Sequence, residues 1–128
     1  MLTIKRQTEY AVFLIHYLHC QNKEVSLKLV SEATSLSLPL LGKVASRLVE
    51  ADILASKEGK GGGYRLKKPL KKITLKEIMD IFETKRRIVS CFADEQSCIA
   101  DCRLKSFWHK VEKDLEKRLG RIRLSKML

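Results

Sequence analysis

The sequence predicts a mainly α-helical fold with one small β-hairpin and a long helix near the C-terminus. Three observations predict it: apolar residues at helical spacing before residue 83, a glycine-rich turn between two short β-type segments, and a heptad-like apolar seam after residue 104. With 128 residues, of which 45% are hydrophobic and 32% charged, the chain can bury a core. A folded globular protein is therefore expected.

Apolar spacing and helix-capping residues define the first three helices. The stripe of the first helix, residues 4–20, consists of Ile4, Ala11, Leu14, Ile15 and Leu18. Ser26 is a good N-cap for a second helix that carries Leu27, Val30 and Ala33 at helical spacing. Residues 34–37 turn the chain, and Pro39 lies in the first turn of a third helix that ends near Asp52.

The second and third helices, joined by a short turn, form a helix-turn-helix, whose second helix enters the major groove of DNA. Residues 53–57 and 64–66 are expected to be strands, and the glycines of 59–63 form the tight turn between them. A hairpin in this place is a wing, and Thr74 caps one more helix after it. No helix and no Gly-Lys-Ser/Thr follows the glycines, which argues against a nucleotide-binding loop. Residues 1–83 are therefore predicted to be a winged helix-turn-helix DNA-binding domain.

The charge of the chain favours a polyanionic partner. The formal net charge is +11, and residues 57–72 hold seven basic side chains and one acidic side chain. Such a stripe is either a solvated face or a surface for DNA phosphates, which release counterions when neutralised. The predicted DNA-binding residues are Ser37, Leu38, Gly42, Lys43, Ser46, Arg47, Lys57, Lys60 and Arg65. The expected partner is double-stranded DNA with a palindromic operator.

Residues 84–103 hold three cysteines, Cys91, Cys98 and Cys102, in a C-x6-C-x3-C pattern that predicts a sensor loop. Clustered thiols in a cytosolic protein are better metal or redox ligands than disulfide partners, and flanking arginines and lysines favour the thiolate form. The spacing is compatible with an iron–sulfur cluster, with a zinc site or with unliganded cysteines. Cys20 lies on the first helix and is interpreted as a core residue.

Residues 104–128 are predicted to be a dimerisation helix and tail. Its seam residues, three and four positions apart, are Phe107, Trp108, Val111, Leu115, Leu119 and Ile122. A homodimer contact is favoured over packing against the same chain. No apolar run approaches the length of a membrane span, so a cytoplasmic protein without a membrane partner is expected. The three histidines, His16, His19 and His109, suggest no nucleophile–base pair, and we expect no enzyme activity.

Five motifs together resemble one family over nearly the whole chain. They are Thr-x5-Glu-Tyr-Ala from Thr3, Val25-Ser-Leu-Lys, Leu48-x2-Ala-x-Ile-Leu, Gly61-Gly-Gly-Tyr-Arg-Leu and Ile73-Thr-Leu, followed by the cysteines and Trp108. The chain resembles the winged-helix regulators that include the iron–sulfur regulator IscR, the nitric-oxide sensor NsrR and the cysteine-metabolism repressor CymR. The resemblance implies a homodimer formed through the long C-terminal helices.

The resemblance also implies a [2Fe–2S] or [4Fe–4S] cluster held by Cys91, Cys98 and Cys102. In some family members a carboxylate from the partner's first helix is the fourth ligand, and Glu9 matches that position; His109 is the second choice. The sequence therefore predicts a DNA-binding transcription regulator, most simply a repressor, that senses redox, iron or nitric oxide status through the cluster. The alternative is a metal-free regulator of the same family, controlled by a protein partner, a small molecule or thiol oxidation.

Overall fold

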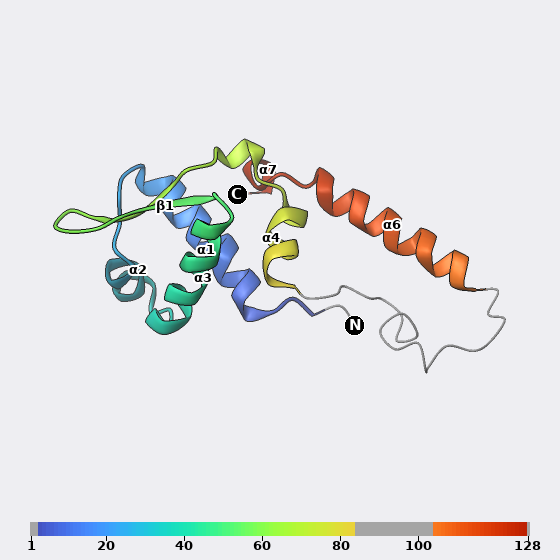
Figure 1. Cartoon of the computed structure of the whole chain (residues 1–128), viewed down its shortest axis with the longest axis horizontal. Helices are drawn as coiled ribbons and strands as arrows, with labels where there is room; N and C mark the ends of the chain where they lie inside the picture. The colour runs from blue at the N-terminus through green and yellow to red at the C-terminus, as the bar shows by residue number, and fades with distance from the viewer. Residues whose placement is uncertain (1–2, 84–103, 128) are drawn as a thin grey trace.

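A computed structural model describes residues 3–83 and 104–127 and confirms the predicted fold class. Figure 1 shows a helical body that carries a hairpin at one end, with one long helix projecting from the other. The elements in chain order are α1 (Arg6–Gln21), α2 (Leu27–Thr34), α3 (Leu38–Glu50), β1 (Leu54–Lys57), β2 (Gly63–Leu66), η1 (Leu70–Lys72), α4 (Leu75–Phe82), α6 (Lys105–Arg121) and α7 (Leu124–Met127).

Short polar side chains begin three of these helices. Ser26, Ser37 and Thr74 accept hydrogen bonds from backbone N–H groups in the first turns of α2, α3 and α4, at donor–acceptor distances of 3.2, 3.4 and 3.2 Å. Asn22 ends α1 in the left-handed conformation, with φ of 52°. The capping residues Ser26 and Thr74 confirm the boundaries predicted from the sequence.

The core lies where α1, α3, α4 and the base of the hairpin meet. It holds the apolar stripes of α1 and α3 and, from later elements, Ile53, Leu54, Ile73, Ile78 and Phe82. Three predicted core positions are wrong. Ile4 precedes α1 and is 43% exposed, Cys20 is exposed near the end of α1, and Ala33 is exposed on α2. Ile4 lies before the first turn of α1, whereas Cys20 and Ala33 each lie one residue before the end of their helix.

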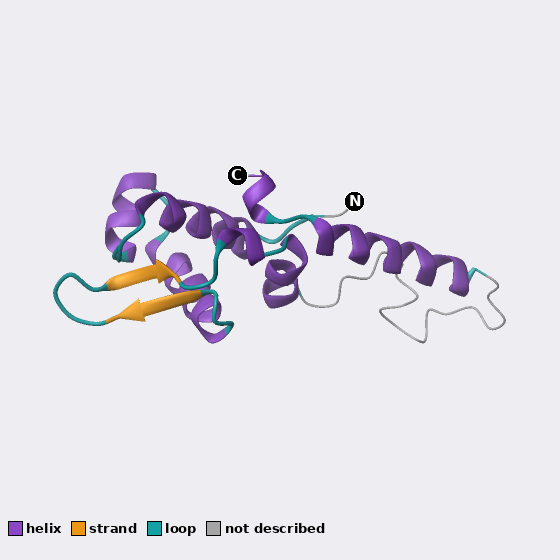
Figure 2. Ribbon diagram, turned by 90° about the horizontal axis from the view of Figure 1, so that it is seen from above, coloured by secondary structure: helices purple, strands orange, loops and turns teal. Residues whose placement is uncertain are grey.

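The two strands pair antiparallel, with Leu54 opposite Leu66 and Lys57 opposite Gly63 (Figure 2). Because side chains alternate along a strand, Leu54, Tyr64 and Leu66 share the face that packs on the core. Lys57 and Arg65 belong to the opposite face, and both are exposed. The hairpin therefore separates its apolar face from its basic face.

Gly63 allows the hairpin to approach the segment before α2. Val25 forms an isolated antiparallel bridge with Tyr64, through N···O distances of 2.9 and 2.8 Å. A Cβ atom at Gly63 would lie 2.4 Å from the carbonyl carbon and oxygen of Val25, and the glycine has a φ of +146°. The last glycine of the turn is thus required both by backbone conformation and by this contact.

We expect Gly63→Ala to lower the free energy of unfolding by about 2 kcal/mol or more, because alanine is strained at this φ and its Cβ would clash with the Val25 backbone. Urea denaturation followed by circular dichroism measures the change. Gly42→Ala is the matched control. A Cβ at Gly42 meets nothing within 4 Å inside α3, so this variant should gain roughly 0.5–1 kcal/mol. Equal stability of the two variants would contradict the prediction.

The C-terminal tail returns to the winged domain, which the sequence did not predict. Arg123 bridges to Thr74, the Leu75 N–H donates to the Ile122 carbonyl at 2.9 Å, and the Leu124 N–H donates to the Ile73 carbonyl at 3.0 Å. Leu124 is 2% exposed. The long helix α6 therefore ends at Arg121, before the last predicted seam residue Ile122, and α7 in the tail packs against η1.

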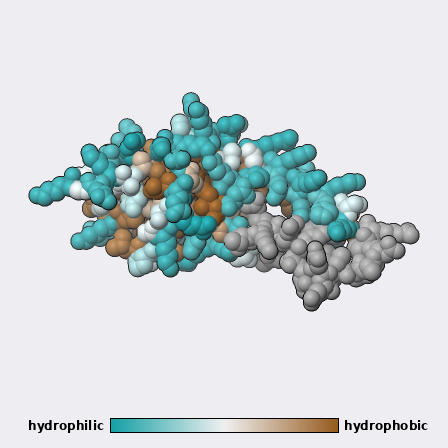
Figure 3. Space-filling model, in the orientation of Figure 1, coloured by the Kyte–Doolittle hydropathy of each residue, from teal (hydrophilic) through white to brown (hydrophobic). Residues whose placement is uncertain are grey.

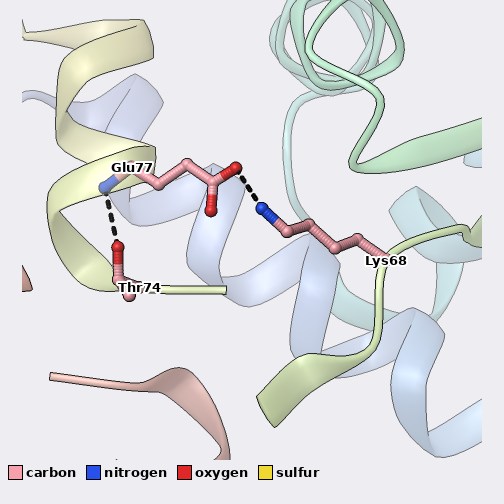
Figure 4. A network of polar contacts seen from close by, with 3 residues as sticks. All are labelled: Lys68, Thr74 and Glu77. Carbon is pink, nitrogen blue, oxygen red and sulfur yellow. Dashed lines mark hydrogen bonds and ion pairs between the residues drawn. The ribbon is translucent and has the colours of Figure 1, made fainter. Parts of the chain in front are cut away.

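A second contact, made by the segment after the wing, also fixes the start of α4. Figure 4 shows Glu77, whose N–H is capped by Thr74 and whose carboxylate lies 2.6 Å from the ammonium group of Lys68. Both charged side chains are about one-third exposed. This contact joins the segment after the wing to α4 and holds the wing and α4 in one body.

Candidate nucleic-acid interface

The solvent-facing side of α3 carries the residues predicted to reach DNA bases. Lys43 and Ser46 are exposed, whereas Val44, Ala45 and Leu48 on the opposite side are fully buried. Gly42 is half-buried and has open space above its Cα atom. The recognition helix is thus anchored by one face and free on the other, as groove insertion requires.

The N-terminus of α3 offers backbone donors beside this face. Ser37 caps the N–H of Leu40, and its own N–H donates to the Tyr10 hydroxyl at 3.2 Å. Pro39 has no N–H group. The N–H of Leu38 is left as a helix-terminal donor with no hydrogen-bond acceptor among residues 3–83 and 104–127, which suits it to a phosphate oxygen.

Arg47 lies one turn after Lys43 but has a different partner. Its Nη2 donates to the carbonyl oxygen of Ile81, and its guanidinium carbon lies 4.9 Å from the centre of the Phe82 ring. The structure therefore places the predicted DNA-binding Arg47 against the end of α4, although Arg47 is exposed like Lys43 and Ser46. Nothing in the sequence signalled this contact, because α4 begins almost thirty residues later.

The wing contributes the second basic surface. Lys57 and Lys60 are exposed, and Figure 3 shows hydrophilic side chains over the tip of the hairpin. Arg65 is also exposed, but its Nε lies 3.5 Å from a carboxylate oxygen of Glu24, a solvent-exposed pair that contributes little stability. Glu58 is exposed beside Lys57 and reduces the positive charge of the tip.

A hollow of about 680 Å³ at the base of the wing extends the basic surface. Lys23, Arg65, Lys67, Lys68 and Lys71 line it together with apolar side chains such as Leu70. Sequence reasoning counted the lysines of 67–71 as part of a basic stripe and did not place Lys23 with them. The run of basic residues in the sequence was the signal that pointed to this surface. Lys23, in the segment before α2, joins the other lysines only in the folded structure.

Comparison with known proteins identifies the family. The model of a family described as "Rrf2: Iron-dependent Transcriptional regulator" matches residues 4–128. This chain belongs to the Rrf2 family. The transcriptional regulator NsrR of Shouchella clausii is 32% identical over 109 residues, which cover 81% of this chain and 73% of the relative. Membership of a family of transcriptional regulators implies DNA binding and agrees with the two basic surfaces.

Solved structures of other regulators have the same fold. The structure of T. potens IscR matches with a TM-score of 0.73 and 28% identity, over 98% of this chain and 85% of that protein. CymR, the global cysteine regulator of B. subtilis, matches with a TM-score of 0.78 and 22% identity, over 99% and 96% of the two chains. The likeness to CymR shows the fold alone. Together these matches confirm the winged-helix architecture predicted from the sequence.

The predicted cluster ligands lie only partly within the described structure. Cys91, Cys98 and Cys102 fall in residues 84–103, outside the described residues. Glu9 is exposed in the first turn of α1, and His109 is exposed near the start of α6. Within residues 3–83 and 104–127 no three His, Cys, Asp or Glu side chains meet as metal ligands. Three thiols and an accessible carboxylate are a donor set that fits an iron–sulfur cluster.

The described part of this Rrf2 chain contains no helix with the length and apolar character of a membrane span. Two of the three histidines lie on α1, whose apolar face is buried in the core. His19 is exposed, and His16 is half-buried with its Nε2 at 3.9 Å from the Cys20 sulfur. The relatives are transcriptional regulators, consistent with the prediction of a non-enzymatic protein.

Proposed function

We propose that this Rrf2 protein is a cytoplasmic, homodimeric repressor whose affinity for a palindromic operator depends on an iron–sulfur cluster held by Cys91, Cys98 and Cys102. The single observation that carries the DNA-binding part is the placement of α3 and the hairpin. Both lie at the end of the molecule opposite the projecting end of α6, and both turn basic side chains to solvent (Figure 1). This arrangement suits a helix in the major groove with a wing on the neighbouring backbone.

Each proposed contact has a separate role. Lys43 and Ser46, with Gly42 beside them, face the base edges, while Ser37 and the Leu38 N–H hold a phosphate at the start of α3. Lys57, Lys60 and Arg65 hold the wing against the backbone. The thiolates of Cys91, Cys98 and Cys102 would hold the cluster, whose iron would supply the redox chemistry, and the exposed Glu9 of the partner's α1 would complete the ligand set.

Dimerisation is proposed from α6. No residue of Lys105–Arg121 is buried, although its seam includes Phe107, which is 52% exposed, and Trp108. The helix contacts α4, and Val111, Leu115 and Leu119 of the seam are half-buried. A long helix that leaves an apolar seam only partly covered is typical of a subunit contact. Two copies joined there would present two α3 helices to half-sites about one helical turn apart.

Neutralising the proposed contacts tests the function. We expect the variant with Lys43, Lys57 and Lys60 all changed to Gln to bind its operator roughly 10²-fold more weakly at low salt. The slope of log affinity against log salt should fall by about 0.9 for each phosphate that the variant no longer neutralises. The probe is a duplex of roughly 30 base pairs, long enough for two half-sites, that the wild-type protein has selected from a random pool. Fluorescence anisotropy at several salt concentrations measures both quantities.

Lys110→Gln is the matched control, because Lys110 is exposed on α6, away from α3 and the hairpin. The control should bind with wild-type affinity and salt slope. A triple variant that binds as tightly as the wild type would refute the proposed interface.

A further inference from the structure

The last turn of α4 receives a cation from α3. The final carbonyls of a helix have no partner within it, and positive charge is favourable at this end. Arg47, in the last turn of α3, donates from Nη2 to the carbonyl oxygen of Ile81. The same guanidinium lies over the ring of Phe82, which is only 1% exposed. The recognition helix thus provides the side chain that stabilises the C-terminus of α4.

The residue that ends α4 makes a second connection, to α1. The carboxylate of Glu83 accepts a hydrogen bond from the backbone N–H of Lys5 at 2.7 Å and from the Thr8 hydroxyl at 2.8 Å. Lys5 has no side-chain cap of its own, and Thr8 is 1% exposed. A carboxylate at a helix N-terminus is favourable, so Glu83 takes the place of the Ser or Thr caps found on α2, α3 and α4.

These contacts make Ile81–Glu83 a junction between two helices and the predicted sensor loop. The carbonyl oxygen of Ile81 accepts a hydrogen bond from Arg47 in the last turn of α3. The carboxylate of Glu83 accepts one from the N–H of Lys5, at the start of α1 and four residues before Glu9. Residue 84, the first of the cysteine-containing segment, follows directly in the chain. Glu83 itself bonds to α1, and the two residues before it, Ile81 and Phe82, contact Arg47 of α3, so a shift at the end of α4 changes the support of both helices.

We propose that Arg47 and Glu83 are positioning residues, through which the state of the cysteine-containing segment sets the orientation of the recognition helix. This inference rests on the proposed function. In it Arg47 does not touch DNA: it fixes the angle of α3 through α4, while Lys43 on the same helix contacts DNA. The two roles predict different measurements, because a phosphate contact changes the salt slope and a positioning contact does not.

Hydrogen exchange tests the junction without reference to any cluster. In the full-length protein as purified, Glu83→Gln weakens the contact with α1 and should loosen the end of α4. We expect the amides in the last turn of α3, Leu48 to Ala51, to exchange about fivefold faster. The Glu83 carboxylate bonds to α1 and not to α3, so this effect would have to pass through the end of α4. Glu32→Gln, at an exposed site on α2, is the control and should leave them unchanged. Unchanged exchange in Glu83→Gln would overturn the inference.

DNA binding tests the coupling. Arg47→Met keeps an apolar stem over Phe82 but removes the donor and the charge; Lys43→Met is its matched control one turn earlier. We expect Arg47→Met to bring the ratio of affinities of the cluster-loaded and cluster-free proteins close to one, with the salt slope of the wild type. Lys43→Met should weaken both forms equally and lower the slope.

The other outcomes are equally decisive. If Arg47→Met weakens both forms equally and lowers the slope, Arg47 contacts phosphate and the inference is overturned; an unchanged ratio also overturns it. If the wild-type protein gives equal affinities in its two forms, the proposed function fails, and the exchange of the α3 amides alone then decides whether the junction exists.

Discussion

Cys98→Ala is expected to remove all the iron and acid-labile sulfide that the wild-type protein carries after anaerobic purification. The proposed cluster has three thiolate ligands, and two thiolates with one carboxylate do not hold it. Among residues 3–83 and 104–127 no three His, Cys, Asp or Glu side chains meet to form an alternative metal site. Iron and sulfide assays, with the visible absorption spectrum, measure the change.

Cys20→Ala is the matched control for Cys98→Ala. Cys20 is exposed on α1 and its sulfur lies beside His16, so its removal should leave iron and sulfide at wild-type levels. Glu9→Ala should retain the cysteine ligands but lose the cluster faster on exposure to air. A wild-type protein that holds zinc without sulfide, or no metal, would contradict the cluster and favour the metal-free regulator.

Local signals made the helix-turn-helix and the wing predictable from sequence. Ser26 and Thr74 begin helices because a short hydroxyl side chain satisfies a free N–H one turn ahead, and that requirement does not depend on distant residues. The glycine turn is equally local: Gly59, Gly61 and Gly63 all have positive φ. Such features can therefore be predicted from a single sequence.

Contacts between distant segments were not predictable in this way. The bridge of Val25 to Tyr64 and the return of Arg123 to Thr74 depend on how elements far apart in the chain come together. Arg47 shows the consequence for the candidate site. Its spacing from Lys43 predicted a DNA-facing residue, but a long flexible side chain at the end of α3 reaches the α4 carbonyl that needs a donor.

The partly covered seam of α6 leads to the last prediction. Val111→Glu should convert the dimer to a monomer, because a carboxylate at the centre of an apolar subunit contact loses its water without gaining a partner. Operator affinity should fall by roughly 10²–10⁴, since the second half-site no longer benefits from the effective concentration that dimerisation gives. Sedimentation equilibrium measures the mass, and anisotropy measures the affinity.

Ser106→Glu adds the same charge to an exposed position of α6 outside the seam and should leave a dimer with wild-type affinity. The body of the protein should stay folded in both variants, because α6 contributes no buried residue and the tail is anchored separately by Leu124. Helical content and the unfolding midpoint of the winged domain therefore distinguish loss of the dimer from loss of the fold. If Val111→Glu remains dimeric, the two recognition helices are joined through another surface, and the predicted half-site spacing no longer follows from α6.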